Sequence, residues 1–242
     1  LQPQYTGNDL LIHYGTPLVT QNGTVLVTVK TGASGNFQIE ARRASDGLLG
    51  WTMPTDYILA PHNWTPSCGS TLTKDDVLAV PAAGGTVLLR STPDLATGVV
   101  QRVAFYGLAN YQANPGAYDN NVIIDTPITA DRDGNLYFGF VVLGNTPIGL
   151  SSGIARIDSS GVGSWVSAAV AANDNGIAKV AYNCAPAMSL DGRSLYVGVN
   201  DINNSGFGRG YLLKLDSTTL HQQARVRLKD VARPANDAYL AD

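Results

Sequence analysis

Residues 128–138 read Ile-Thr-Ala-Asp-Arg-Asp-Gly-Asn-Leu-Tyr-Phe: a short apolar segment, a tight turn and a second apolar segment. The Asp-Gly pair supplies the positive φ angles that a two-residue turn needs, and the residues beside it suit a pleated surface. The same arrangement returns at 18–27, 72–80 and 188–197, with Asn-Gly, Asp-Asp and Asp-Gly at the turn. Each stretch predicts a β-hairpin, and recurrence at this spacing is typical of propellers and solenoids.

A second motif follows each hairpin after a gap of variable length. It reads Ala-Ser-Asp-Gly-Leu-Leu-Gly-Trp at 44–51, Asp-Leu-Ala-Thr-Gly at 94–98, Asp-Ser-Ser-Gly-Val-Gly-Ser-Trp at 158–165 and Asp-Ser-Thr-Thr-Leu at 216–220. Over roughly residues 16–230 the chain resembles the quinoprotein-dehydrogenase-like (PQQ-like) β-propeller repeat, whose signature is Asp-x-x-Thr-Gly-x-x-x-Trp. In that family the turn joins the two outer strands of a blade, and the Trp packs between blades.

The copies depart from this signature at single positions. Trp51 is kept although Arg43 replaces the Asp, and Trp165 is kept with one residue missing before it. The remaining departures are Arg102 at the Trp position of the second copy and, in the last copy, Leu220 for Gly and Ala224 for Trp.

These repeats predict an all-β fold, a β-propeller of four-stranded antiparallel blades with four blades visible. We expect residues 1–242 to form one propeller domain, with blades at about 16–55, 70–106, 126–168 and 185–230. Because an open ring leaves blade faces and strand edges exposed, two arrangements follow. Either the ends of the chain close a ring of four or five blades, or the chain is part of a ring of six to eight blades, which we favour. In the second case missing blades or self-association would cover the open edge.

Composition limits the partners and the compartment. The 16 basic and 19 acidic residues show no run that would suit nucleic acid or an anionic membrane. No apolar stretch is long enough to span a bilayer, so we expect no membrane span. Charged residues make up only 14% of the chain and Lys is scarce, while Gly, Ser, Thr and Asn are abundant. This composition suits an extracytoplasmic protein, periplasmic or secreted.

Candidate binding residues lie in the long connections between blades, at 52–69, 107–125 and 168–185. In a propeller these connections share one face, and long loops on a rigid scaffold are where binding residues concentrate. Aromatic rings stack on flat apolar ligand surfaces and amides orient a ligand by hydrogen bonds, so we expect a glycan, peptide or protein ligand. The alternative is that the loop aromatics pack on one another. The candidates are His62, Asn63, Trp64, Tyr111, Tyr118, Asp119, Tyr182 and Asn183.

No residue pattern predicts a cofactor or a metal site. The three His residues are well separated, and residues 131–135 are better explained as a turn than as a calcium loop because no distal carboxylate follows. Cys68 and Cys184 lead into the innermost strands of the second and fourth blades. Across a central channel their Cα atoms would be too far apart for a disulfide in all but a small ring.

A non-catalytic binding module is therefore the favoured function. The alternative is an extracytoplasmic enzyme on the same scaffold, either a quinone-dependent oxidoreductase, suggested by the repeat family alone, or a polysaccharide-active enzyme using His62, Tyr118 or Asp119. A third role is assembly through the open propeller edge.

Overall fold

The computed structural model describes residues 15–32, 35–59, 68–182, 184–201 and 209–228. They fold into four antiparallel sheets in chain order, which confirms the predicted β-propeller fold. The first sheet holds β1 (Leu18–Val19), β2 (Thr24–Gly32), β3 (Gly35–Arg43) and β4 (Leu49–Thr55). The second holds β5 (Thr71–Leu72), β6 (Leu78–Pro81), β7 (Thr86–Arg90) and β8 (Val100–Ala104). The third holds β9 (Val122–Ile124), β10 (Thr129–Ala130), β11 (Leu136–Val142), β12 (Gly153–Ile157) and β13 (Gly163–Ser167). The fourth holds β14 (Ile177–Val180), β15 (Ala187–Met188), β16 (Ser194–Asp201), β17 (Gly210–Asp216) and β18 (Gln222–Leu228).

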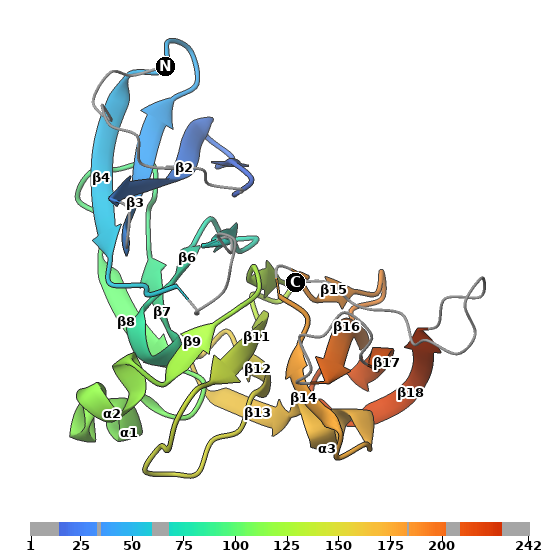
Figure 1. Ribbon diagram of the computed structural model, residues 1–242. Helices are drawn as coiled ribbons and strands as arrows, with labels where there is room; N and C mark the ends of the chain where they lie inside the picture. Colours follow the sequence, from blue (N-terminus) through green and yellow to red (C-terminus); the bar gives the residue numbers. More distant parts are fainter. Residues whose placement is uncertain (1–14, 33–34, 60–67, 183, 202–208, 229–242) are drawn as a thin grey trace.

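The sheets stand along an open arc, with the first strand of each sheet on the inner side and the last strand on the outer side (Figure 1). In the third and fourth sheets the innermost strand is interrupted. β9 and β10 both pair with β11, and β14 and β15 both pair with β16. Neighbouring inner segments touch, since Ile128 N–H donates to Gly69 O at 3.0 Å and Thr129 Oγ1 donates to Pro186 O at 2.5 Å.

The inner turns have a geometry that differs from the expected two-residue turn. In each, the left-handed residue closes the turn: Gly23 (φ 86°), Asp76 (φ 53°), Gly134 (φ 85°) and Gly192 (φ 73°). The residue before it is not left-handed, and the closing N–H donates to the carbonyl three residues earlier. This is a type I turn followed by a left-handed residue, a three-residue hairpin loop. The prediction of a two-residue turn was wrong, but each turn does need one left-handed residue, which is Gly in three turns and Asp76 in the other.

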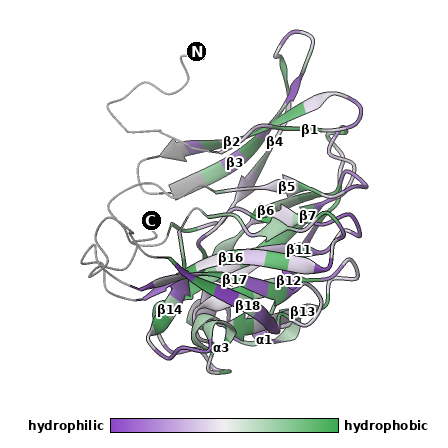
Figure 2. Ribbon diagram, turned by 90° about the vertical axis from the view of Figure 1, so that its right-hand side faces the viewer, coloured by the Kyte–Doolittle hydropathy of each residue, from purple (hydrophilic) through white to green (hydrophobic). Residues whose placement is uncertain are grey.

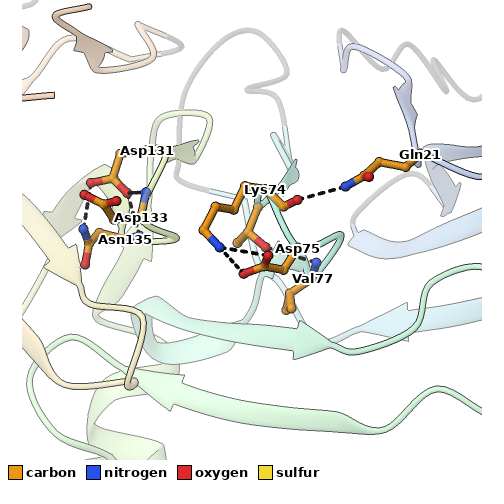
Figure 3. Close-up of polar contacts among 8 residues, drawn as sticks. Gln21, Lys74, Asp75, Val77, Asp131, Asp133 and Asn135 are labelled. Atoms are coloured by element: carbon orange, nitrogen blue, oxygen red, sulfur yellow. Dashed lines mark hydrogen bonds and ion pairs between the residues drawn. The ribbon is translucent and has the colours of Figure 1, made fainter. Parts of the chain in front are cut away.

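Figure 3 shows how polar contacts fix these turns. The Asp131 carboxylate accepts the N–H groups of Asp133 at 2.9 Å and Asn135 at 2.8 Å, and the Asn135 side-chain amide at 2.7 Å. The first two sheets are linked at the same side, where Gln21 Nε2 donates to Lys74 O at 2.9 Å. The carboxylate oxygens of Asp131 therefore close a turn, as predicted for 131–135.

Each sheet has two faces because side chains alternate along a strand. We call the face toward the next sheet in chain order the forward face and the opposite face the rear face. A cross-strand apolar pair recurs on the forward face: Ile39–Met53, Val87–Val103, Ile154–Val166 and Leu212–Val226. An apolar residue recurs on the rear face: Val27, Val80, Phe138 and Val197. The core forms where a forward face packs on the next rear face. Figure 2 shows green, hydrophobic residues along many of the strands and purple, hydrophilic residues at many of the turns.

The two Trp residues of the repeat lie on opposite faces. Trp51 is on the forward face, and its Nε1 donates to Pro93 O of the second sheet at 2.9 Å. Trp165 is on the rear face, in the same cross-strand row as Phe138. β3 and β4 contain a bulge at Gly50, whereas β12 and β13 pair without one. Because side chains alternate between the two faces of a sheet, the insertion or loss of one residue moves a side chain to the opposite face. The residue missing before Trp165 therefore explains why Trp165 lies on the rear face and Trp51 on the forward face.

Two of the long connections contain regular structure, where the sequence predicts loops. Residues 107–125 include α1 (Leu108–Ala113), α2 (Pro115–Asp119) and β9, and residues 168–185 include α3 (Ala168–Ala172) and β14. A short 3-10 helix, η1 (Ala83–Gly85), joins β6 to β7. α1 and α2 lie on the outer side of the arc between the second and third sheets (Figure 1). Among the described residues, no helix has the length and apolar character needed to cross a membrane.

Candidate functional site

The candidate residues of the second connection, Tyr111, Tyr118 and Asp119, form one packed group with Tyr106, and Arg102 lies beside them; we call this group the rim cluster. The Tyr118 side chain is 1% exposed and stacks on Tyr106, with ring centroids 4.6 Å apart and planes 16° apart. Tyr106 Oη donates to Gly84 O at 2.7 Å. The Arg102 guanidinium lies over the Tyr111 ring at 5.3 Å. Tyr111 and Tyr118 thus pack with Tyr106 as part of the hydrophobic core of the first three sheets.

Burial also governs the chemistry of the rim cluster. Loss of water contact raises the pKa of the Tyr106, Tyr111 and Tyr118 phenols, because the charged phenolate is poorly solvated there. These side chains stay protonated at neutral pH, and Tyr118 presents no open ring face for a ligand. Asp119 is half-buried at the C-terminal end of α2.

His62, Asn63, Trp64 and Asn183 lie outside the described residues. The remaining candidate, Tyr182, is buried near the inner side of the arc. The ammonium of Lys179 lies 3.6 Å from the centroid of its ring, a cation–π contact. Lys179 is itself buried in β14, opposite Asn200 of β16.

Tyr57 extends this group toward the first two sheets. It leaves the end of β4, packs edge to face on Phe37 at 5.6 Å, and donates its hydroxyl to Ile124 O of the third sheet at 2.5 Å. Burial raises the pKa of the Tyr57 phenol well above its usual value of 10.0, and the nearby Cys68, Asp125 and Tyr182 side chains raise it further. The phenol is therefore a permanent hydrogen-bond donor at neutral pH.

Asp125 supplies the acidic group of the same region. Its carboxylate is 0% exposed, and its N–H donates to Gly139 O at 3.1 Å. A Cβ at Gly139 would lie 2.8 Å from both Asp125 Oδ1 and Val180 Cβ, so the third and fourth sheets meet at this carboxylate. We call Tyr57, Cys68, Asp125, Lys179 and Tyr182 the axial cluster.

The structure therefore divides the sequence-derived candidates between two places. Tyr111, Tyr118 and Asp119 belong to the rim cluster, and Tyr182 belongs to the axial cluster. Sequence reasoning missed Asp125 and Lys179. The signal available for them was a lone charge inside an apolar run, Val-Ile-Ile-Asp at 122–125 and Ile-Ala-Lys-Val at 177–180.

The axial cluster can donate and accept hydrogen bonds but lacks an activated thiol. Burial raises the pKa of the Cys68 thiol far above its usual value of 9.0, which keeps it neutral. Cys68 and Cys184 are not joined by a disulfide; Cys68 is buried and Cys184 exposed. Among the described residues, no group of three or more His, Cys, Asp or Glu side chains is placed to hold a metal ion.

Comparison with solved structures supports the propeller fold. The quinohemoprotein alcohol dehydrogenase from Comamonas testosteroni is 13% identical, with a TM-score of 0.54 over 92% of this chain and 39% of that chain. The Dos1 propeller is 15% identical (TM-score 0.47; 89% and 51% coverage), and a luciferin-regenerating enzyme is 13% identical (0.40; 91% and 78%). This chain thus spans about half the length of the Dos1 propeller structure and less of the dehydrogenase. No protein-family model and no curated protein matches the sequence, so the PQQ-like repeat stays a prediction.

Proposed function

We propose that this chain is a non-catalytic binding module that takes its ligand at the axial cluster. The observation that carries the proposal is the convergence of a buried carboxylate, a buried ammonium and two phenols from separate parts of the propeller. Tyr57 comes from the connection after the first sheet, Asp125 from the third sheet, and Lys179 and Tyr182 from the fourth.

The fold of the repeat does not require a carboxylate at Asp125. Asp125 N–H donates to Gly139 O, and at the equivalent place in the fourth sheet Ala181 N–H donates to Gly198 O. An alanine therefore satisfies the same backbone position. A buried carboxylate at a position where the repeat accepts alanine favours a role in recognition.

The chemistry of the cluster fits a ligand rich in hydroxyl and amide groups, a glycan or a peptide. Asp125 accepts hydrogen bonds, Lys179 donates them, and Tyr182 combines a ring with a hydroxyl group, while Tyr57, which is bonded to Ile124 O, supports the cluster from the side of the first sheet. Aromatic and amide-binding groups at one place are how proteins orient such ligands.

Screening of the chain on glycan and peptide arrays, followed by calorimetry on any hit, tests this function. Asp125→Asn and Lys179→Met should each weaken binding by about tenfold or more, equivalent to about 1.4 kcal/mol. Asp119→Asn makes the same chemical change in the rim cluster and should leave affinity unchanged. Circular dichroism checks that each variant is folded. Equal affinity in the Asp125 variant and the wild type would contradict the proposal.

The buried acid of the cluster also favours a second candidate, an enzyme on the propeller scaffold. Asp125 would be its general acid or base. Polysaccharide cleavage and quinone-dependent dye reduction are the assays. Asp125→Asn should then abolish turnover while substrate binding persists, whereas loss of binding alone supports the first proposal.

The compartment belongs to the same proposal. The low content of charged residues, 14% of the chain, supports an extracytoplasmic location. Cell fractionation with an antibody against the chain tests it, and recovery in the cytoplasmic fraction alone would contradict it.

A further inference from the structure

An indole ring fills the interface between the first and second sheets near the outer turn. Trp51 of β4 extends to the outer turn of the second sheet, where its Nε1 donates to Pro93 O at 2.9 Å. The Arg90 guanidinium lies over the indole ring at 3.9 Å. An aromatic ring with one N–H donor therefore occupies the space between the last strand of one sheet and the outer turn of the next.

The second and third sheets meet at the same elements by direct contact. A Cβ on Gly161, in the outer turn of the third sheet, would lie 3.5 Å from Val103 Cγ1 of β8. A Cβ on Gly163, at the start of β13, would lie 2.1 Å from the carbonyl oxygen of Phe105. The two sheets approach each other here too closely for a ring to lie between them.

The interface between the third and fourth sheets contains a cavity at this place. The Trp165 ring lies on the rear face of its sheet and packs on Phe140, with ring centroids 6.1 Å apart. Toward the fourth sheet, a cavity of about 380 Å³ is bordered by Trp165 and Val166 of β13, by α3 and by residues 219–222. This volume is within the range of pockets that hold small molecules. We call it the interface cavity.

Apolar and polar groups both line the interface cavity. Leu220 is buried and Val166 partly buried, and both supply apolar surface. Asn173, Thr219 and His221 are exposed lining residues with an amide, a hydroxyl and an imidazole group. None of the described residues that line the cavity is Asp, Glu, Lys or Arg. This combination suits an uncharged ligand that has an apolar ring and a hydrogen-bonding group.

We propose that the interface cavity binds a small uncharged molecule that contains a planar aromatic ring with an N–H or hydroxyl group. The ligand takes the place between the third and fourth sheets that the Trp51 indole takes between the first and second. Apolar cavities in proteins bind small aromatic rings in this way. The inference does not rest on the proposed function, because the interface cavity lies at the outer turn of the fourth sheet and the axial cluster lies on the inner side of the arc.

Titration of the full chain with indole, followed by NMR, tests the proposal. Indole should bind with a dissociation constant of about 1 mM or below, and should shift the methyl resonances of Val166 and Leu220, which line the cavity. Methyl glucoside is the comparison ligand, since it has hydroxyl groups but no aromatic ring, and it should leave these resonances unchanged. Shifts produced by the glucoside and not by indole would overturn the assignment of an aromatic ligand.

A variant that fills the interface cavity separates this site from adventitious binding elsewhere. Val170 lines the cavity and is 69% exposed, so Val170→Trp should place an indole there and weaken binding of free indole by about tenfold or more. Val162→Trp makes the same change at a valine that is 63% exposed and outside the cavity, and it should keep the wild-type affinity. Circular dichroism checks that both variants are folded. A wild type that does not bind indole, indole-induced shifts confined to other residues, or equal affinity in Val170→Trp and the wild type would overturn the proposal.

Discussion

Gly163→Ala tests how tightly the second and third sheets are packed. A Cβ on Gly163 would lie 2.1 Å from the carbonyl oxygen of Phe105 and 2.3 Å from its carbonyl carbon and Cα. Side-chain carbons do not approach other heavy atoms within 3.0 Å, so the two segments would have to separate by about 1 Å. The atoms in the way belong to the backbone and cannot rotate aside.

The cost should reach the upper end of the range for overpacked cores, about 3 kcal/mol. Separation would also loosen the ring contacts of Phe105 with Phe138 at 5.9 Å and with Phe140 at 4.3 Å. For a chain of this size a loss of that order lowers the melting temperature by roughly 6–12 °C.

Thermal and denaturant unfolding, followed by circular dichroism, measure the effect. Gly116→Ala is the control, because Gly116 lies in α2 with no atom within 4 Å of the added Cβ. That change should stabilise the chain by up to about 1 kcal/mol. If both variants unfold at the wild-type midpoint, the close approach between the two sheets is refuted.

Two further outcomes follow from the outer turns. Leu220 has a left-handed φ of 58° and its side chain is 2% exposed. Leu220→Gly relieves backbone strain of about 1 kcal/mol but loses apolar burial of about 2 kcal/mol, so the variant should unfold at a lower urea concentration than the wild type. A variant that is more stable than the wild type would show that strain outweighs burial at this position. The Ser160 hydroxyl and backbone N–H groups lower the pKa of Asp158 from its usual value of 3.8. Hydrogen bonds from the Thr219 backbone and side chain lower the pKa of Asp216 from the same value. The stabilisation that these two carboxylates give the folded state is complete above their unfolded-state pKa and is lost as pH falls through the lowered pKa values. The free energy of unfolding should therefore decrease below about pH 4, and this decrease should be smaller in the variant that carries both Asp158→Asn and Asp216→Asn. An unchanged acid transition in that variant would contradict this account.

Local turn chemistry made much of the fold predictable. A Gly or Asp that must be left-handed, followed by an apolar strand, identifies each inner hairpin wherever the repeat occurs, and Gly134 and Gly192 hold that conformation. The number of sheets and their order followed from the recurrence of these turns.

Features that depend on contacts between sheets were not predictable from the sequence. Tyr118 has the composition of a ligand-binding residue, but its stacking on Tyr106 depends on how the second connection folds back on η1. Asp125 follows an apolar run and gives no motif. Its burial arises because the third and fourth sheets meet at Gly139.

The reversal of Trp165 has a consequence for engineering the chain. Its outer hairpin anchors the third sheet to its predecessor, whereas the hairpin that bears Trp51 anchors the first sheet to its successor. The repeats are therefore not interchangeable modules. Transplanting the segment around Trp51 into the third position would turn the indole toward the fourth sheet and leave a void beside Phe140, which Trp165 contacts. A consensus design averaged over these repeats would therefore keep neither attachment.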